Sequence, residues 1–256
     1  MKVSPPVLEV RRLSLSFGGV QAVRGIDFRV EPGEVFAIIG PNGAGKTSVF
    51  NLITRVFDAS AGSVHVGERD ITHVPRHDVV RHGVARTFQN IELFEGATVL
   101  DNLLLGQHRM LRSSLASRLL NLRATREEEV AARARVEDVI ELLGLASHRD
   151  ELVAGLPYGV RKIVELGRAL ASAPDILLLD EPASGLNPEE TRELALWIQE
   201  MRERLGITLV MVEHDMSLVS AVADRVLAMD QGQAIRIGKP AEVQSDPRVV
   251  AAYLGH

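Results

Sequence analysis

One stretch decides the fold class: Gly40-Pro41-Asn42-Gly43-Ala44-Gly45-Lys46-Thr47 fits the phosphate-binding pattern G-x-x-x-x-G-K-[ST]. It follows a continuous apolar run at residues 35–39 and precedes a helical pattern, which is the context in which this pattern holds phosphate. The glycines let backbone N–H groups close around phosphates, and the helix N-terminus adds partial positive charge. The stretch therefore predicts a nucleotide site in an α/β fold.

The side chains of this loop have separate expected roles. Lys46 would reach the β- and γ-phosphates, and the Thr47 hydroxyl would bind Mg²⁺. The other loop residues that we expect to contact the nucleotide are Asn42, Gly43, Ala44, Gly45 and Ser48. The alternative is a glycine-rich turn with an incidental lysine, and the flanking strand and helix patterns favour nucleotide binding over it.

Two adjacent carboxylates, Asp180 and Glu181, end the apolar run at residues 176–179. Ligands gather at the carboxyl ends of strands in open α/β sheets, so we expect Asp180 to hold Mg²⁺. Glu181 would act as the general base that polarises the attacking water, a role worth about 10² to 10⁴ in rate. Alone, the pair could equally cap the next helix, but the phosphate loop favours catalysis.

Short apolar runs and helical patterns alternate along the rest of the chain. Runs at residues 176–179, 207–212 and 225–229 resemble strands buried on both faces, as does 35–39. The alternation predicts a mostly parallel sheet with helices on both faces. One helix has explicit start signals, with Asn187 as N-cap, Pro188 at the first position and Glu190 at the third, and it should end before Gly206.

The two remaining regions have different patterns. Residues 8–17 and 26–30 alternate apolar with polar around a turn at 31–34, which predicts an antiparallel N-terminal region. Residues 98–145 are helical throughout, with a capping box at 125–128 and a stop at Gly144. We therefore expect a helical subdomain at 90–165, inserted into a nucleotide-binding core formed by 1–89 and 166–256.

Composition narrows the classes of function. The 256 residues carry a net charge of −5 and no cysteine, which disfavours a nucleic-acid partner and excludes disulfides and thiolate metal sites. No apolar run approaches the roughly 18 residues of a membrane span, and no secretory signal is readable, so we expect the chain on the cytoplasmic side. Residues 109–135 hold seven arginines and three glutamates. That basic stretch is either a solvated helix face or a surface for lipid headgroups or a partner.

Further motifs share an order and spacing that resembles ABC transporter ATPase subunits over essentially the whole chain. After the phosphate loop come Arg86-Thr87-Phe88-Gln89, Leu156-Pro157-Tyr158-Gly159, Asp180-Glu181-Pro182, Ser184-Gly185-Leu186-Asn187 and His214. The resemblance implies a P-loop NTPase with a RecA-like core, ATP and Mg²⁺ as ligands, and a dimer that sandwiches two nucleotides. It also implies that hydrolysis opens the dimer.

The resemblance also assigns roles to individual residues. It implies that Phe17 stacks on adenine, that Gln89 senses Mg²⁺ and the attacking water, and that His214 contacts the γ-phosphate. From the sequence alone Phe17 could instead be a strand core residue, Gln89 a surface polar residue and His214 an ordinary satisfied histidine. The resemblance further places Leu156, Pro157, Tyr158 and Gly159 against the nucleotide of the opposite subunit.

One departure from the family pattern concerns this last segment. The family signature usually reads L-S-G-G-Q, whereas this chain has Leu156-Pro157-Tyr158-Gly159-Val160. Pro157 removes a hydroxyl and a backbone N–H at the position where family members donate to the γ-phosphate. The contribution of this signature to the opposite site is therefore in doubt.

A narrower resemblance is to the ATPases of branched-chain amino acid importers. It rests on residues 86–90, 98–104, 246–247 and 252–255, and on the long helical stretch near 109–135. It implies a prokaryotic peripheral protein on the cytoplasmic membrane face, with permease subunits, a second ATPase subunit and indirectly a solute-binding protein as partners. The expected permease surface is residues 91–105, apolar at Ile91, Leu93, Phe94, Val99 and Leu100, although each of these could equally be a core residue.

Three alternatives lie outside transport. A soluble ABC protein of translation or DNA repair resembles a fused double cassette or carries long coiled-coil insertions, and this chain has one cassette and no such insertion. A P-loop kinase or GTPase leaves Gln89, residues 184–187 and His214 without a role. A regulator that never hydrolyses ATP should lack Glu181 or His214, and both are present.

Overall fold

The computed structural model describes residues 7–87, 91–107 and 123–254, and the chain divides into two compact units. The first unit contains residues 1–89 and 175–256, and the second contains residues 90–174. The second boundary lies after Pro174 rather than at the expected residue 165. The reason is that helix α5 (Tyr158–Leu170) belongs to the second unit as a whole, since its Gly167 packs against Leu103 and Leu143 there.

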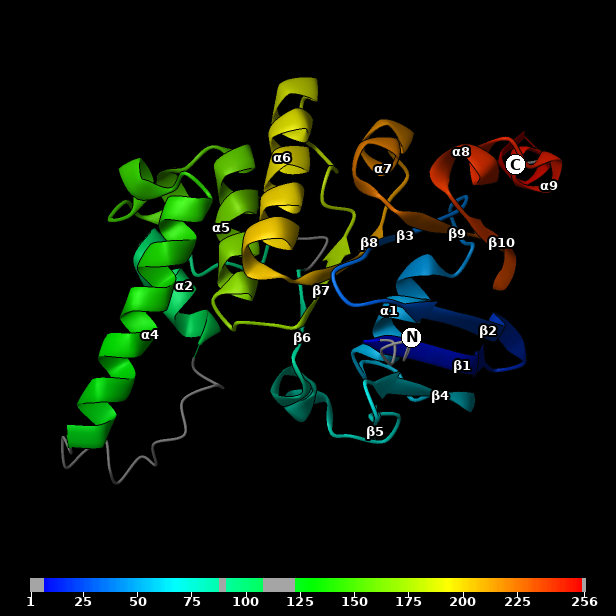
Figure 1. Ribbon diagram of the computed structural model, residues 1–256, viewed down its shortest axis with the longest axis horizontal. Helices are drawn as coiled ribbons and strands as arrows, with labels where there is room; N and C mark the ends of the chain where they lie inside the picture. The colour runs from blue at the N-terminus through cyan, green and yellow to red at the C-terminus, as the bar shows by residue number, and fades with distance from the viewer. Residues whose placement is uncertain (1–6, 88–90, 108–122, 255–256) are drawn as a thin grey trace, which may run out of the picture. The chain divides into compact units, whose positions relative to one another are not determined.

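An antiparallel sheet forms the N-terminal part of the first unit (Figure 1). Its strands are β1 (Leu8–Phe17), β2 (Val20–Val30), β4 (Ala61–Val66) and β5 (Arg69–Asp70), in the order β2-β1-β4-β5. The alternation in residues 8–15 buries Leu8, Val10, Leu13 and Leu15. The predicted antiparallel region is confirmed, and β4 and β5 extend it beyond the segments that the sequence pattern identified.

A second sheet carries the predicted buried strands. Its order is β10-β9-β3-β8-β7-β6, and every neighbouring pair is parallel except β9 and β10. The strands are β3 (Val35–Ile39), β6 (Val84–Arg86), β7 (Ile176–Asp180), β8 (Thr208–Val212), β9 (Arg225–Asp230) and β10 (Gln233–Gly238). The predicted mostly parallel sheet is therefore confirmed.

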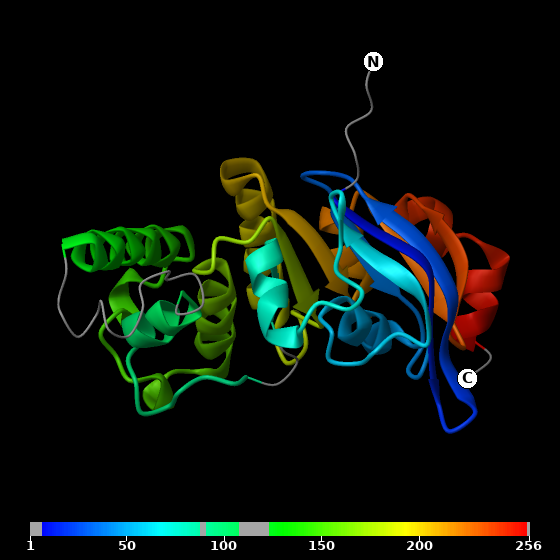
Figure 2. The same cartoon turned by 90° about the horizontal axis from the view of Figure 1, so that it is seen from below.

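Helices cover both faces of this second sheet, as predicted. Helix α1 (Lys46–Ile53) lies on the side of the antiparallel sheet, and its Phe50 and Leu52 share one core with residues of both sheets. Helices α6 (Pro188–Leu205) and α7 (Met216–Val222) lie on the other side (Figures 1 and 2). A 3₁₀ helix, η1 (Arg76–His82), precedes β6.

Helix α6 begins as its sequence signals predict. The Asn187 side chain accepts from the N–H groups of Glu189 and Glu190 at 2.9 and 3.0 Å. The Glu190 carboxylate in turn accepts from the Asn187 N–H at 2.7 Å, which completes a capping box. Gly206 ends the helix in the left-handed conformation, with φ of 65°.

The second unit is helical in its described parts. It contains α2 (Val99–Gly106), α4 (Arg123–Leu142), α5 and the 3₁₀ helices η2 (Ala146–His148) and η3 (Val153–Gly155). The predicted stop is confirmed, because Gly144 has φ of 65° just after α4. The capping box at 125–128 does not mark a helix start, because the described part of α4 already includes Arg123 and Ala124.

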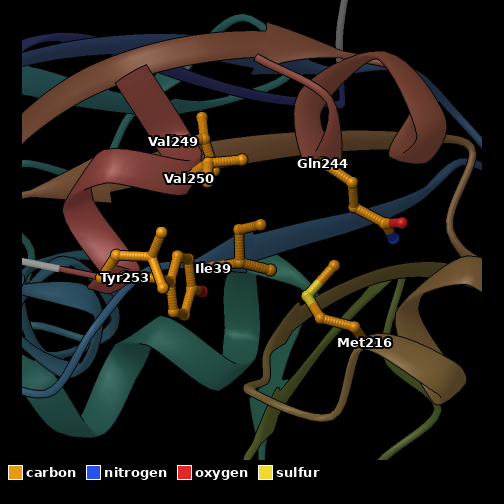
Figure 3. Close-up of a pocket in the computed structure, with 7 residues that line it drawn as sticks. Ile39, Met216, Gln244, Val249, Val250 and Tyr253 are labelled. Atoms are coloured by element: carbon orange, nitrogen blue, oxygen red, sulfur yellow. The ribbon is translucent and has the colours of Figure 1, made fainter. Parts of the chain in front are cut away.

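The C-terminal helices α8 (Pro240–Gln244) and α9 (Pro247–Leu254) belong to the first unit, and their side chains line the pocket drawn in Figure 3. A pocket of about 230 Å³ lies among β3, α7, α8 and α9, and its lining is Ile39, Met216, Gln244, Val249, Val250, Tyr253 and Leu254. Burial raises the pKa of the Tyr253 phenol, and a hydrogen bond from the Gly40 backbone opposes this shift. Helix α9 thus reaches the start of the phosphate loop.

Within the described ranges, the structure has no helix that combines the length and apolar character needed to cross a bilayer.

Candidate nucleotide site

The phosphate loop connects β3 to α1, and two of its glycines are required by close packing. A Cβ atom on Gly40 would lie 2.2 Å from the Met229 carbonyl oxygen. One on Gly45 would lie 2.5 Å from the Ala22 carbonyl oxygen, and Gly45 also has φ of 96° as the N-cap of α1. Any larger residue at these positions would displace β9 or β2 from the loop.

Lys46 is buried at the centre of this loop, with 6% of its surface exposed. Its Nζ donates to the carbonyl oxygens of Gly40 at 2.7 Å and Pro41 at 3.1 Å. Burial lowers the pKa of Lys46, and the charges of Glu181, Asp180 and Glu213 oppose this shift. The lysine thus lies in the field of three carboxylates from the ends of β7 and β8.

Asp180 ends β7 and is 2% exposed. Its Oδ2 accepts from Nη2 of Arg86 at 2.5 Å, and Nη1 of Arg86 also donates to Asn51 of α1 at 2.8 Å. The other oxygen, Oδ1, is buried and has no hydrogen-bond partner among the described residues. A buried carboxylate oxygen left without a partner is unusual, and it fits a hard cation or its water ligands.

Glu181 has a backbone conformation that is rare for a residue with a side chain. Its φ is 48°, in the left-handed region, which costs about 1–3 kcal/mol for a non-glycine residue. Its N–H donates to the Val212 carbonyl at 2.9 Å, and its own carbonyl accepts from the Ser184 N–H at 3.1 Å. The turn after β7 is therefore held in a strained form at the predicted general base.

His214 follows β8, and its side chain is 59% exposed. Its backbone N–H donates to Oε2 of Glu213 at 2.9 Å, and its ring Nδ1 lies 3.8 Å from the same oxygen. The next residue, Asp215, caps α7 by accepting from the Ser217 N–H at 2.8 Å. The imidazole is therefore exposed on a well-fixed backbone and is not an ordinary buried histidine.

Phe17 is 49% exposed at the end of β1, so it is not a strand core residue. Its ring meets the edge of Phe57 at 5.1 Å between centroids, with planes at 80°. Phe17 pairs with Val20 in the β1–β2 hairpin, and Ala22 of the same hairpin approaches Gly45. An exposed aromatic ring thus lies on the hairpin that packs against the phosphate loop.

Gln89 lies outside the described residues, so its predicted role has no geometry to test it. The chain leading to it is fixed beside β7. The Thr87 N–H donates to the Leu178 carbonyl at 2.9 Å, and Oγ1 of Thr87 accepts from the Asp180 N–H at 3.4 Å.

The signature segment begins helix α5 of the second unit. Pro157 is the N-cap and provides no side-chain cap, so the first turn of α5 lacks the hydrogen bond that a serine hydroxyl would supply. Tyr158 is 43% exposed, with Nζ of Lys162 5.8 Å from its ring centroid, whereas Leu156 and Gly159 are buried. A helix thus begins at this segment even though Pro157 stands where the family usually has serine.

Glu213 is a site residue that the sequence analysis missed. It is fully buried, and its carboxylate accepts backbone N–H groups from the loops after both β7 and β8. The only sequence signal is a glutamate between an apolar run and His214, which does not distinguish a buried anchor from a solvated strand end.

Together, the phosphate loop, the buried lysine and the strand-end carboxylates define a P-loop nucleotide-binding protein. The chain belongs to the ABC transporter family, whose model matches residues 23–184. A second model, described as branched-chain amino acid ATP-binding cassette transporter, matches residues 237–256. The chain is thus an ABC ATPase rather than a kinase or GTPase.

Similar proteins cover the whole chain. The high-affinity branched-chain amino acid transport ATP-binding protein LivG of Salmonella typhimurium is 40% identical over 253 residues, 99% of each chain. The corresponding protein BraF of Pseudomonas aeruginosa is 38% identical over the same share. A nucleotide-free ATP-binding cassette from an ABC transporter has a TM-score of 0.85 at 32% identity, covering 98% of this chain and all of that one. These relatives favour transport over the soluble alternative.

Proposed function

We propose that this chain hydrolyses Mg-ATP to power an importer of branched-chain amino acids or related solutes, as a peripheral subunit on the cytoplasmic membrane face. The observation that carries the proposal is the similarity to LivG and BraF over 99% of the chain. The match of residues 237–256 to the branched-chain family model supports it independently of the nucleotide motifs.

The residues fit a magnesium ion together with ATP. Bound Mg²⁺ would neutralise charge on the β- and γ-phosphates. The residues that would hold it are Asp180, through the partnerless Oδ1, the Thr47 hydroxyl at the start of α1, and Gln89. Residues 42–48 bind the phosphates, and Phe17 offers its exposed ring to adenine.

Hydrolysis then depends on two residues of the chain. The Glu181 carboxylate accepts the proton of the attacking water, and the backbone turn at φ of 48° orients that carboxylate. His214 contacts the γ-phosphate from the loop after β8, where its exposed ring is available. Lys46 exchanges its two carbonyl partners for phosphate oxygens when ATP binds.

The partners are permease subunits, a second ABC ATPase subunit and, indirectly, a solute-binding protein. The segment Leu156, Pro157, Tyr158 and Gly159 faces the nucleotide of the second ATPase in the closed dimer through its exposed residues Pro157 and Tyr158, since Leu156 and Gly159 are buried. The permease surface is narrower than residues 91–105, because Val99 and Leu100 are buried in the helical unit. Phe94, which is 60% exposed, is the residue of that segment best suited to contact a permease.

The test is reconstitution of the chain with candidate permeases, a second ATPase and a binding protein from the same genome. In proteoliposomes with ATP inside, radiolabelled leucine should accumulate, and sulfate should not. Accumulation that is independent of ATP, or absent for every branched-chain amino acid, would contradict the proposal.

A further inference from the structure

The loops that carry Glu181 and His214 are joined by one carboxylate, that of Glu213. Its Oε1 accepts from the Ala183 N–H at 2.8 Å, which belongs to the loop after β7. Its Oε2 accepts from the N–H groups of His214 at 2.9 Å and Asp215 at 3.1 Å, in the loop after β8. All three partners are backbone donors, so an ionised carboxylate satisfies them with both oxygens.

This carboxylate is fully buried, at 0% exposure. A buried charge is retained only where hydrogen bonds compensate its desolvation, and these three bonds do so. The bonds also fix its direction, and the Glu213 backbone just after β8 is held in place because its N–H donates to the Ile38 carbonyl of β3 at 3.2 Å. Glu213 is therefore a rigid bridge between the two loops, built on a central strand.

The bridge acts on the strained turn at Glu181. Ala183 lies two residues after Glu181, and Ser184 closes the turn by donating to the Glu181 carbonyl. A left-handed backbone conformation at a non-glycine residue persists only when contacts with the surrounding structure hold it in place. The bond from the Ala183 N–H to the Glu213 carboxylate is a side-chain interaction that helps to keep this turn closed.

We propose that Glu213 is a positioning residue for ATP hydrolysis, which holds the Glu181 turn and the His214 backbone in one fixed arrangement. Glu213 itself touches neither ATP nor the attacking water in this role. Its loss should lower the rate of the chemical step and leave ATP binding by the loop at residues 40–47 nearly unchanged. The inference rests on the proposed role of Glu181 as general base.

Two substitutions break the bridge in different ways. Glu213→Gln keeps the shape of the side chain but replaces one acceptor oxygen with an NH₂ group. In one of the two loops a backbone N–H would then point at this NH₂ donor instead of at an acceptor. Glu213→Asp keeps the charge and can still accept from the nearby Asp215 N–H, but it is one methylene too short to reach Ala183. Both variants should reduce kcat at least tenfold, with the KM for ATP within threefold of wild type.

A matched control is Glu34→Gln. Glu34 is also a buried carboxylate, 7% exposed, and it accepts from the Glu31 N–H at 2.7 Å and from Arg225 at 3.1 Å. It precedes β3, at the opposite end of that strand from Gly40. Glu34→Gln should lower the thermal midpoint about as much as Glu213→Gln does, with kcat within twofold of wild type.

Combining the Glu213 substitution with Glu181→Gln shows whether Glu213 acts by positioning Glu181 or by destabilising the site in general. If Glu213 acts through Glu181, then adding Glu213→Asp to Glu181→Gln should reduce the residual kcat by less than threefold. The inference would be overturned by any of three results. The double variant could lose a further tenfold in kcat, Glu213→Asp could keep a kcat within twofold of wild type, or Glu34→Gln could lose as much kcat as the Glu213 variants. If Glu181→Gln itself retains wild-type kcat, then the proposed role of Glu181 as general base is wrong, and this result is distinct from a failure of the Glu213 inference alone.

Discussion

At the residue scale, Lys46 gives the sharpest test of nucleotide binding. Lys46→Ala removes a charge-assisted contact to phosphate worth about 1.5–3 kcal/mol, together with the neutralisation of the β- and γ-phosphates. We expect ATP affinity to fall at least tenfold, measured by titration with a fluorescent ATP analogue. Lys239→Ala removes an exposed lysine and serves as the control. An unchanged affinity in Lys46→Ala would count against the loop assignment.

Glu181 tests the chemistry at the same scale. Glu181→Gln keeps shape and hydrogen bonding but removes the base, so hydrolysis should fall by about 10² or more. ATP should still bind, and the ATP-bound dimer should accumulate in size-exclusion chromatography. Wild-type turnover in this variant would exclude Glu181 as the general base and make His214 the next candidate.

At this scale the phosphate loop can be recognised from sequence, because the residues that bind phosphate have few chemical alternatives. The loop from Gly40 to Thr47 must combine tight turns, a cation and a hydroxyl in one order, so its pattern is specific. Glu213 is different, since its importance comes from donors on Ala183 and His214, and the Ala183 donor lies on a loop 30 residues away in sequence. A pattern of neighbouring residues does not contain that information.

At the element scale, prediction succeeded where local chemistry is explicit and failed where it is not. Helix α6 has an N-cap, a proline at its first position and a terminal glycine, and all three have the expected geometry. Strands β5 and β6, with two and three residues, are too short to show a period, and they form only because a partner strand is present. At Thr125 the capping signal was outweighed by continuation of α4.

The cap of α6 provides a test of stability. Asn187→Ala removes the side-chain acceptor for Glu189 and Glu190, which should lower the free energy of unfolding by about 0.5–2 kcal/mol. Urea denaturation followed by circular dichroism measures this change. Gln199→Ala, at an exposed position in the middle of α6, should change stability by less than about 0.5 kcal/mol. Equal stability of the two variants would show that the capping box contributes nothing.

At the scale of the whole molecule, ABC ATPases work as dimers, and we expect Pro157 to make the dimer of this chain asymmetric. A hydroxyl that donates to a charged phosphate is worth about 1.5–3 kcal/mol, whereas a helix N-terminus contributes about 0.3–1 kcal/mol. Helix α5 begins at Tyr158 without a side-chain cap, so its N-terminus alone should not replace the missing donor. We therefore expect the site completed by this chain to be the weaker one, and the chain to work best opposite a different ATPase with an intact signature.

The experiment compares the ATPase rate of this chain alone with its rate beside the partner ATPase encoded nearby. Pro157→Ser should raise the rate of the homodimer several-fold, because it restores the hydroxyl. Pro157→Ala is the matched control, since it restores the backbone N–H but adds no hydroxyl. The exposed Tyr158 ring could offset part of the loss, and Tyr158→Phe tests its hydroxyl. A fully active wild-type homodimer that neither Pro157→Ser nor the partner accelerates would eliminate the asymmetric dimer.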